Sequence, residues 1–379
     1  MAWIKKYAVA SGTRYRVYWK DLSGRQQGKV FSRLAEARSY KRELEQRLET
    51  GSYTSPARGR ITLRELWSDF EATPHRPLAA STASLYRLQW RLHIDPALGD
   101  RRINSIEPGD VRRFIAQMEA DGVGLSMIDS TFRLLRSMLS LAVRDRRISL
   151  NPASGIQPPR AVPKEMRFLN ASEVNAIADC IAPRYRALVL TLAYTGVRIG
   201  EAAALRVRRV DLLHRRIEVL EAAAEVDGMR FVGETKTRQK RSVAIPAFLS
   251  DILAEHIALY AATGPDALVF TSEAASPVSQ HAFRRTFHVA CRKASVAPVP
   301  RVHDLRHTAA ALAISAGGHA KLVQDMLGHS SIATTMNVYG HLFDSLHADV
   351  AQKLDALYAD ASSAGDEAMI VTQIAKQGE

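Results

Sequence analysis

The sequence predicts a mainly helical protein with small β-sheets, an α+β fold class divided into several domains. The chain has 379 residues, which is enough for two or three domains, and its 46% hydrophobic content allows substantial cores. The first 28 residues alternate with the period of strands and precede a helical segment. From Thr62 onward the hydrophobic period is helical, with two short strand-like interruptions.

The N-terminal residues 1–55 are expected to form a three-stranded sheet with one helix. Residues 14–19 (RYRVYW) alternate, so that even and odd positions face opposite sides of a sheet. A helix is expected from Ser32 to about Glu49. Residues 1–60 hold 14 Lys plus Arg against 5 Asp plus Glu, most of the chain's net charge of +13. This basic, aromatic module suits a DNA groove; a hairpin that merely packs on the next domain is the alternative.

Charge and composition limit the class of protein. A net charge of +13 indicates a polyanionic partner, because each phosphate that Lys or Arg neutralises releases a counterion. Cys180 and Cys291 are too few for a disulfide framework and lack metal-ligand spacing, so both are expected to be buried thiols. The sequence has no signal-peptide pattern and no apolar run of membrane-spanning length. We therefore expect a soluble protein without a membrane partner, in the cytoplasm of a bacterial host, where it would associate with the nucleoid.

Two further domains and a tail are expected after a linker at residues 51–60. A four-helix module with basic edges occupies residues 60–155, and its apolar stripes form its core. Its helices are expected near residues 62–70, 81–93, 108–121 and 125–144. A Pro-rich connection leads to a mostly helical domain at residues 165–350, with strands at 216–219 and 242–245. Residues 351–379 form a C-terminal tail that frays or docks on a neighbouring protomer, in cis or in trans.

The third domain carries a candidate site for phosphate chemistry. Arg198, in TGVRIGEAAAL, follows a glycine turn at a helix start, where its planar fork can hold two phosphate oxygens. Glu201 is placed to orient this guanidinium from the same helix face. His303 and Arg306, in VHDLRHTAA, share a helix face and add a second clamp and a group that exchanges protons near neutral pH.

Three more residues complete the candidate set. Lys236, in ETKTRQKRSVAIP, lies between the strands, where a lysine can protonate a leaving oxygen; Lys240 competes for this role. His329, in LGHSSIATT, follows a glycine at a helix end and can bind a phosphate oxygen. Tyr339, in NVYGH, is the candidate nucleophile. We expect nearby positive charge to lower the pKa of Tyr339 and to neutralise the charge that develops on a phosphorane.

His307 is expected to be a packed or hydrogen-bonded helix residue outside the catalytic set. With His303 it also matches the spacing of two zinc ligands on a helix. Against zinc, Asp304 stands where the metalloprotease motif has glutamate, no third ligand has a recognisable motif, and the intervening Arg306 would repel a cation. We therefore expect neither a metal nor a cofactor.

In order and spacing, the six residues resemble the active site of the tyrosine recombinase (phage integrase) family. The resemblance implies an arm-type DNA-binding domain at residues 1–55, a SAM-like core-binding domain at 60–155 and a tyrosine-recombinase catalytic domain at 165–350. It favours Lys236 over Lys240, since the segment through Pro246 is similar to the family's lysine-bearing hairpin.

The resemblance implies a site-specific DNA recombinase, the integrase of a phage or mobile element. Tyr339 would form a 3′-phosphotyrosyl link, Lys236 would protonate the leaving oxygen and His303 would assist proton transfer, while the phosphate would be held by Arg198, Arg306 and His329. A homotetramer would synapse double-stranded attachment sites through a Holliday junction, with a host DNA-bending protein and a directionality factor as further partners. The alternatives are a type IB topoisomerase-like nicking-closing enzyme, a Xer-type chromosome-maintenance recombinase and a non-catalytic DNA-binding regulator.

Overall fold

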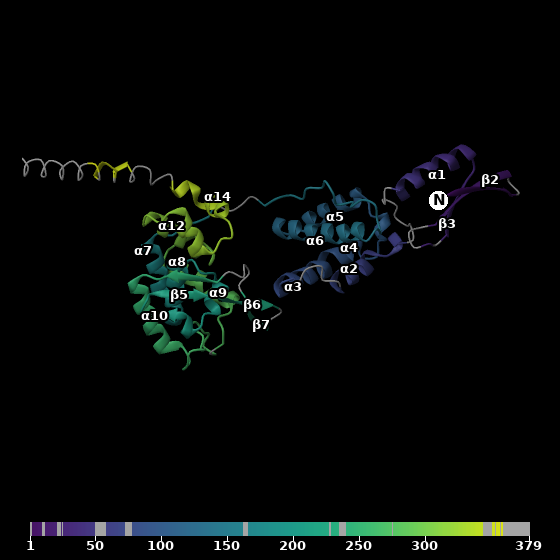
Figure 1. Ribbon diagram of the computed structural model, residues 1–379. Coiled ribbons are helices and arrows are strands. Elements are labelled where there is room, and N and C mark those ends of the chain that lie inside the picture. Colours follow the sequence, from purple (N-terminus) through teal and green to yellow (C-terminus); the bar gives the residue numbers. More distant parts are fainter. Residues whose placement is uncertain are drawn as a thin grey trace, which may run out of the picture. The chain divides into compact units, whose positions relative to one another are not determined.

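The computed structural model describes residues 2–9, 12–20, 24, 26–49, 58–72, 78–161, 166–226, 229–234, 240–274 and 276–343, together with 351–352, 354–356 and 358. The chain divides into two compact units, Met1–Pro163 and Lys164–Glu379. Helices dominate both units, and the sheets are small (Figure 1). This confirms the predicted fold class. No described helix is long and apolar enough to cross a membrane.

The first unit begins with the predicted three-stranded sheet and helix. Its antiparallel strands are β1 (Trp3–Val9), β2 (Gly12–Lys20) and β3 (Gln26–Phe31), followed by α1 (Leu34–Glu49). The helix begins two residues later than the sequence suggested. Val17 and Trp19 of β2 form a small core with Ala37 and Leu44 of α1. On the sheet, the ring of Trp3 stacks on that of Tyr18 with centroids 5.6 Å apart.

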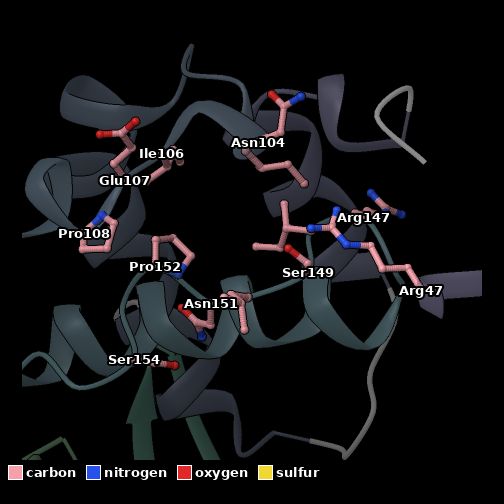
Figure 2. A pocket seen from close by; sticks show the side chains of 13 residues that line it. Arg47, Asn104, Ile106, Glu107, Pro108, Arg147, Ser149, Asn151, Pro152 and Ser154 are labelled. Carbon is pink, nitrogen blue, oxygen red and sulfur yellow. The ribbon is translucent and has the colours of Figure 1, made fainter. Parts of the chain in front are cut away.

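The predicted helical module follows. It consists of η1 (Arg58–Arg60), α2 (Leu63–Ala72), α3 (Ala80–Gln89), the π-helical η2 (Trp90–Ile94), α4 (Asp95–Leu98), η3 (Ile103–Ser105), α5 (Pro108–Ala120) and α6 (Leu125–Arg144). The indoles of Trp67 and Trp90 stack in its core, 5.0 Å apart. A hollow of about 660 Å³ opens between α1, η3 and the chain after α6, where Arg47, Glu107, Arg147 and Asn151 line it (Figure 2). None of the candidate catalytic residues lines this hollow.

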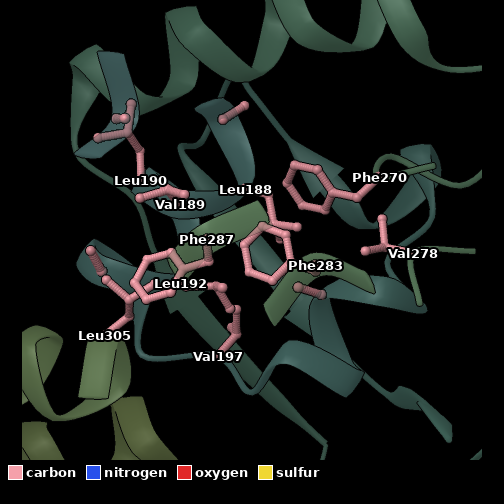
Figure 3. Close-up of a cluster of buried hydrophobic side chains, with 14 of the residues drawn as sticks. Leu188, Val189, Leu190, Leu192, Val197, Phe270, Val278, Phe283, Phe287 and Leu305 are labelled. Carbon is pink, nitrogen blue, oxygen red and sulfur yellow. The ribbon is translucent and has the colours of Figure 1, made fainter. Parts of the chain in front are cut away.

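The second unit is built around α8 (Pro183–Thr195), which packs against α7 (Ala171–Cys180), α10 (Ala247–Tyr260) and α12 (Asp304–Ser315). Leu188 and Leu192 of α8 are buried with Phe283 and Phe287 of α11 (Gln280–Lys293), as Figure 3 shows. The remaining helices are α9 (Ile199–Ala203), η4 (Val207–Arg209), α13 (Ala320–Leu327) and α14 (Ile332–Phe343). This apolar core fixes the ends of α8 and α12, and the candidate site lies at these ends.

Two small sheets accompany the helices. One is antiparallel, with β4 (Val210–Asp211), β5 (Arg216–Val219) and β8 (Arg241–Ala244) in that order, and the other is the hairpin β6 (Glu221–Val226) with β7 (Met229–Glu234). Strands β5 and β8 confirm the two predicted pieces to within one residue. The hairpin was not predicted, because its first strand, EAAAEV, is rich in residues with a low β-propensity.

The structure describes both cysteines and part of the C-terminal tail. Cys291 is fully buried, and burial raises the pKa of its thiol to about 11, as expected for an inert cysteine. Cys180 was also expected to be buried, but it is only half-buried. The tail beyond Tyr358 lies outside the described residues.

Candidate active site

Arg198 is positioned by the turn between α8 and α9. Helix α8 ends at Gly196, which adopts a left-handed conformation (φ +65°), and Arg198 is the N-cap of α9. The carboxylate of Glu201 accepts a hydrogen bond from the Arg198 backbone N–H at 2.8 Å and one from its Nη1 at 2.9 Å. Glu201 therefore orients Arg198, as the sequence suggested. About 31% of the Arg198 side chain remains exposed, so the guanidinium can reach a ligand.

Arg241, at the start of β8, is a member of the site that sequence reasoning missed. Its Nη1 and Nη2 donate to the two carboxylate oxygens of Glu201 at 3.1 and 2.6 Å, and its Nε donates to the carbonyl of Met326 at 3.1 Å. Burial pushes the pKa of Glu201 up, but the hydrogen bonds and charges of Arg241 and Arg198 bring it below its ordinary value. A carboxylate thus lies between two guanidinium groups and is ionised.

Arg306, on α12, joins two turns of the site. It is 3% exposed, and its guanidinium donates to the carbonyls of Gly196 and Leu327. These carbonyls precede Arg198 and His329 by two residues each. Burial and the neighbouring Arg198 lower the pKa of Arg306 to about 9, so the group is still charged at neutral pH. Two of its five N–H donors are used by these carbonyls, which leaves donors for a ligand.

The turn that carries His329 follows the same pattern as that of Arg198. Helix α13 ends at Gly328, which also has φ +65°, and the Cβ of any other residue there would lie 3.0 Å from Cδ of Arg241. The next residue, His329, accepts or donates a hydrogen bond at Nδ1 with the hydroxyl of Thr335, at 3.0 Å. Gly328 and the buried Arg241 beside it therefore fix the position of the His329 backbone.

His303 and His329 are both neutral in this surrounding. Burial, followed by the positive charge of Arg306 and Arg198, lowers the pKa of His329 to about 4. The pKa of His303 is likewise lowered to about 4, by burial, the neighbouring His307 and the same two arginines. Both imidazoles can accept a proton at neutral pH, but each is a weak base.

The charge of Arg306 acts on Tyr339 of α14, but the expectation that the pKa of this phenol is lowered was wrong. The side chain is 1% exposed and packs with Val323, Leu327 and the ring of Phe168. Burial raises the pKa of Tyr339 to about 12, and the opposing effect of Arg306 is smaller. In this structure the phenol is therefore protonated, because loss of water outweighs the attraction of the cation.

His307 is the hydrogen-bond partner of this phenol. Its Nδ1 lies 2.7 Å from the Tyr339 hydroxyl, and its ring meets that of His303 edge-on at 5.0 Å. A packed or hydrogen-bonded His307 was expected from the sequence, and the structure has this arrangement. Its partner could not be foreseen, because residue 339 follows 32 positions later on another helix.

The structure thus brings five of the six candidate residues together. The charge of Arg306 acts on His303, His329 and Tyr339, and that of Arg198 acts on both histidines. The sixth, Lys236, lies outside the described residues; its competitor Lys240 is described, and is exposed just before β8. In the described part of the chain, no group of three His, Cys, Asp or Glu side chains is placed to hold a metal ion.

The chain is similar to known proteins in sequence and in fold. The phage integrase family model matches residues 167–345. The integrase of Mycobacterium phage D29 is 31% identical over 281 residues, which cover 72% of this chain and 72% of that protein. A structure of the Tn1549 transposon integrase in complex with a circular intermediate DNA has a TM-score of 0.67 at 20% identity, covering 77% of this chain and 99% of that chain. A λ integrase tetramer bound to a Holliday junction has a TM-score of 0.58 at 17% identity, covering 86% and 95% respectively.

The chain therefore belongs to the phage integrase family, the tyrosine-type site-specific recombinases that cleave and rejoin DNA.

Proposed function

We propose that Tyr339 is the nucleophile of this integrase and forms a 3′-phosphotyrosyl intermediate with DNA. The proposal rests on one observation: a phenol, two guanidinium groups and two neutral imidazoles lie close together at the ends of α8, α12 and α13. Fixed cations in a water-poor pocket stabilise the charge that develops on a phosphorane more strongly than water does. A covalent ester also retains the energy of the cleaved bond for rejoining.

Each neighbouring group has a proposed task. Arg198 and Arg306 bind the non-bridging oxygens of the scissile phosphate, Arg198 through its exposed fork and Arg306 through the donors that the two carbonyls leave free. His329 adds a hydrogen bond to the phosphate and His303 assists proton transfer. Lys236, rather than Lys240, protonates the 5′-oxygen that leaves.

The covered position of Tyr339 adds a requirement. At 1% exposure the hydroxyl cannot meet a phosphate, so α14 has to shift when DNA binds. The helix ends at Phe343, and its packing against α13 is what must loosen.

The test of the proposal is to trap the covalent adduct. A nicked attachment-site duplex, whose cleavage releases a short strand that diffuses away, should accumulate a protein–DNA adduct that maps to Tyr339. The variant Tyr339→Phe should bind the same duplex and form no adduct. An adduct that persists in Tyr339→Phe would show that another residue is the nucleophile. Supercoil relaxation at unrelated sequences, without strand exchange between paired sites, would instead favour the topoisomerase-like activity.

The domain assignments are part of the proposal. Residues 60–155 bind the core site, residues 165–350 perform the chemistry and residues 351–379 act as a tail. Residues 1–55 bind arm-type DNA, which their concentration of Lys and Arg and the cation–π contact of Arg16 with Tyr18 support. Deletion of residues 1–55 should weaken binding to arm-type duplexes and leave core-site cleavage intact; unchanged arm binding would contradict this assignment.

We further propose that four protomers act together on synapsed attachment sites. The λ integrase relative is a tetramer bound to a Holliday junction, which supports the same assembly here. A host DNA-bending protein and a directionality factor complete the proposed set of partners. Because the family exchanges strands by transesterification, no metal or cofactor takes part in the proposed reaction.

A further inference from the structure

We propose that His307 is a catalytic residue: its Nδ1 accepts the proton of the Tyr339 phenol as that oxygen attacks the phosphate. This inference depends on the proposed function, in which Tyr339 is the nucleophile. It adds the base that removes the phenol's proton.

Nδ1 of His307 and the hydroxyl of Tyr339 are 2.7 Å apart, within the range of a strong hydrogen bond. The two rings have centroids 5.8 Å apart, and they lie on helices, α12 and α14, that pack against each other. A general base has to be within hydrogen-bond reach of the proton that it removes, and His307 meets this condition before DNA arrives.

The direction of the hydrogen bond follows from the state of both groups. Burial raises the pKa of Tyr339 to about 12, so the phenol holds its proton and acts as the donor. The pKa of His307 is lowered by burial, which outweighs the opposing charge of Asp304, and the charges of Arg301 and Arg306 add to the lowering. The imidazole is therefore neutral, and Nδ1 offers a lone pair to the phenol.

A base is needed because the cations do not ionise the phenol. With its pKa raised rather than lowered, Tyr339 is a poor nucleophile until a neighbour takes its proton. His329 directs Nδ1 to the hydroxyl of Thr335, and His303 meets the ring of His307 edge-on. Of the three histidines, His307 is the one that the structure bonds to the reacting oxygen.

The Tyr339 oxygen forms a bond to phosphorus while the bond from phosphorus to the 5′-oxygen breaks, and the phenol's proton passes to Nδ1 of His307. The departing 5′-oxygen takes a proton from the general acid proposed above, Lys236. In rejoining, a 5′-hydroxyl attacks phosphorus and passes its proton back to Lys236. The bond from phosphorus to the tyrosine oxygen breaks, and the imidazolium of His307 returns the proton to that oxygen.

The test compares His307→Asn with a matched control, His341→Asn, in the full-length protein on the nicked attachment-site duplex. Asparagine can accept the hydrogen bond but takes no proton at neutral pH, so it separates positioning from proton transfer. His341 lies two residues after Tyr339 on the same helix and contacts the ring of Phe168. We expect His307→Asn to slow single-turnover cleavage by about 100-fold or more, with DNA binding retained, and His341→Asn to cleave at the unaltered rate.

A change in the acidity of the nucleophile then identifies the role. A fluorinated tyrosine at position 339 has a more acidic phenol and needs less help, so the loss in His307→Asn should shrink to about tenfold or less. Cleavage by His307→Asn at the unaltered rate, or an equal loss with either phenol, would overturn the inference. Faster cleavage by His307→Ala would also overturn it, because the contact would then restrain the nucleophile rather than activate it.

One measurement avoids any change at His307. The solvent deuterium isotope effect on cleavage should fall when the fluorinated tyrosine replaces Tyr339 in the otherwise unaltered chain, and an unchanged isotope effect contradicts the assignment. The two proposals fail differently. If the unaltered protein forms no adduct at Tyr339, the proposed nucleophile is wrong; if it does and His307→Asn cleaves equally fast, the role of His307 alone is wrong.

Discussion

Replacing Arg241 by methionine should destabilise the second unit strongly, because it leaves a buried carboxylate without its main partner. The side chains of Arg241 and Glu201 are 7% and 2% exposed, and two hydrogen bonds of 3.1 and 2.6 Å join them. Removing one member of a buried ion pair costs about 3–5 kcal/mol. The half-exposed Arg198 remains beside Glu201 but compensates only in part. For a unit of this size, the loss corresponds to a fall in melting temperature of roughly 10 °C.

The two units can be followed separately in one sample. All four tryptophans, Trp3, Trp19, Trp67 and Trp90, belong to the first unit. Tryptophan fluorescence therefore reports the unfolding of that unit, while calorimetry or far-ultraviolet circular dichroism reports both. Arg241→Met should move the calorimetric transition of the second unit and leave the fluorescence transition where it is.

A surface ion pair supplies the matched control. Arg209 and Glu218 form a pair at 2.8 Å whose side chains are 36% and 47% exposed, and such pairs contribute about 0–1 kcal/mol. Arg209→Met should therefore change the melting temperature little. Adding Glu201→Gln to Arg241→Met should recover part of the loss, because it removes the stranded charge. An equal shift of the transition in Arg241→Met and Arg209→Met would show that the buried pair of Arg241 and Glu201 stabilises the unit no more than a surface pair does.

Two further predictions concern the glycine turn and the histidines. Gly196→Ala should lower the free energy of unfolding more than Gly155→Ala does. Both glycines have φ near +70°, but a Cβ at Gly196 would lie 2.6 Å from Leu327, whereas no atom is close to a Cβ at Gly155. Equal losses in urea unfolding would contradict this. The free energy of unfolding should also fall as the pH is lowered from 6.5 toward 4. His303 and His329 have pKa values of about 4 in the folded chain, so on acidification they bind protons in the unfolded chain first. Melting temperatures between pH 6.5 and 5 test this. Replacing both histidines by asparagine should flatten the slope of melting temperature against pH; an unchanged slope would show that other groups cause it.

Features set by neighbouring residues were predictable from the sequence. The cap of α7 is an example: Asn170 and Glu173 satisfy each other's backbone N–H groups, as the spacing of a capping box predicts. Arg198 and Glu201 are three residues apart, so their contact follows from helix geometry. The ends of α8 and α13 could be placed at glycines for the same local reason.

Features that depend on distant segments could not be predicted. The ring of Phe168, far from Tyr339 in sequence, helps to cover the phenol, and this covering reverses the expected direction of its pKa. Arg241 and Glu201 are 40 positions apart, and nothing in RSVAIP distinguishes this arginine from its basic neighbours. The acceptors of Arg306 are backbone carbonyls. Every residue has such a carbonyl, so the sequence does not show which ones accept these hydrogen bonds.

That last feature has a consequence for how the chain tolerates change. A peptide oxygen is present whatever side chain accompanies it. Substitutions around Gly196 and Leu327 can therefore reorient the two carbonyls that bind Arg306 but cannot remove them. A single-residue deletion is different, because it displaces the following backbone by up to about 3.8 Å and removes the oxygen from reach. Random mutagenesis of these two turns, at positions other than the two glycines, Arg198 and His329, should therefore recover many active substitutions and very few active changes of length.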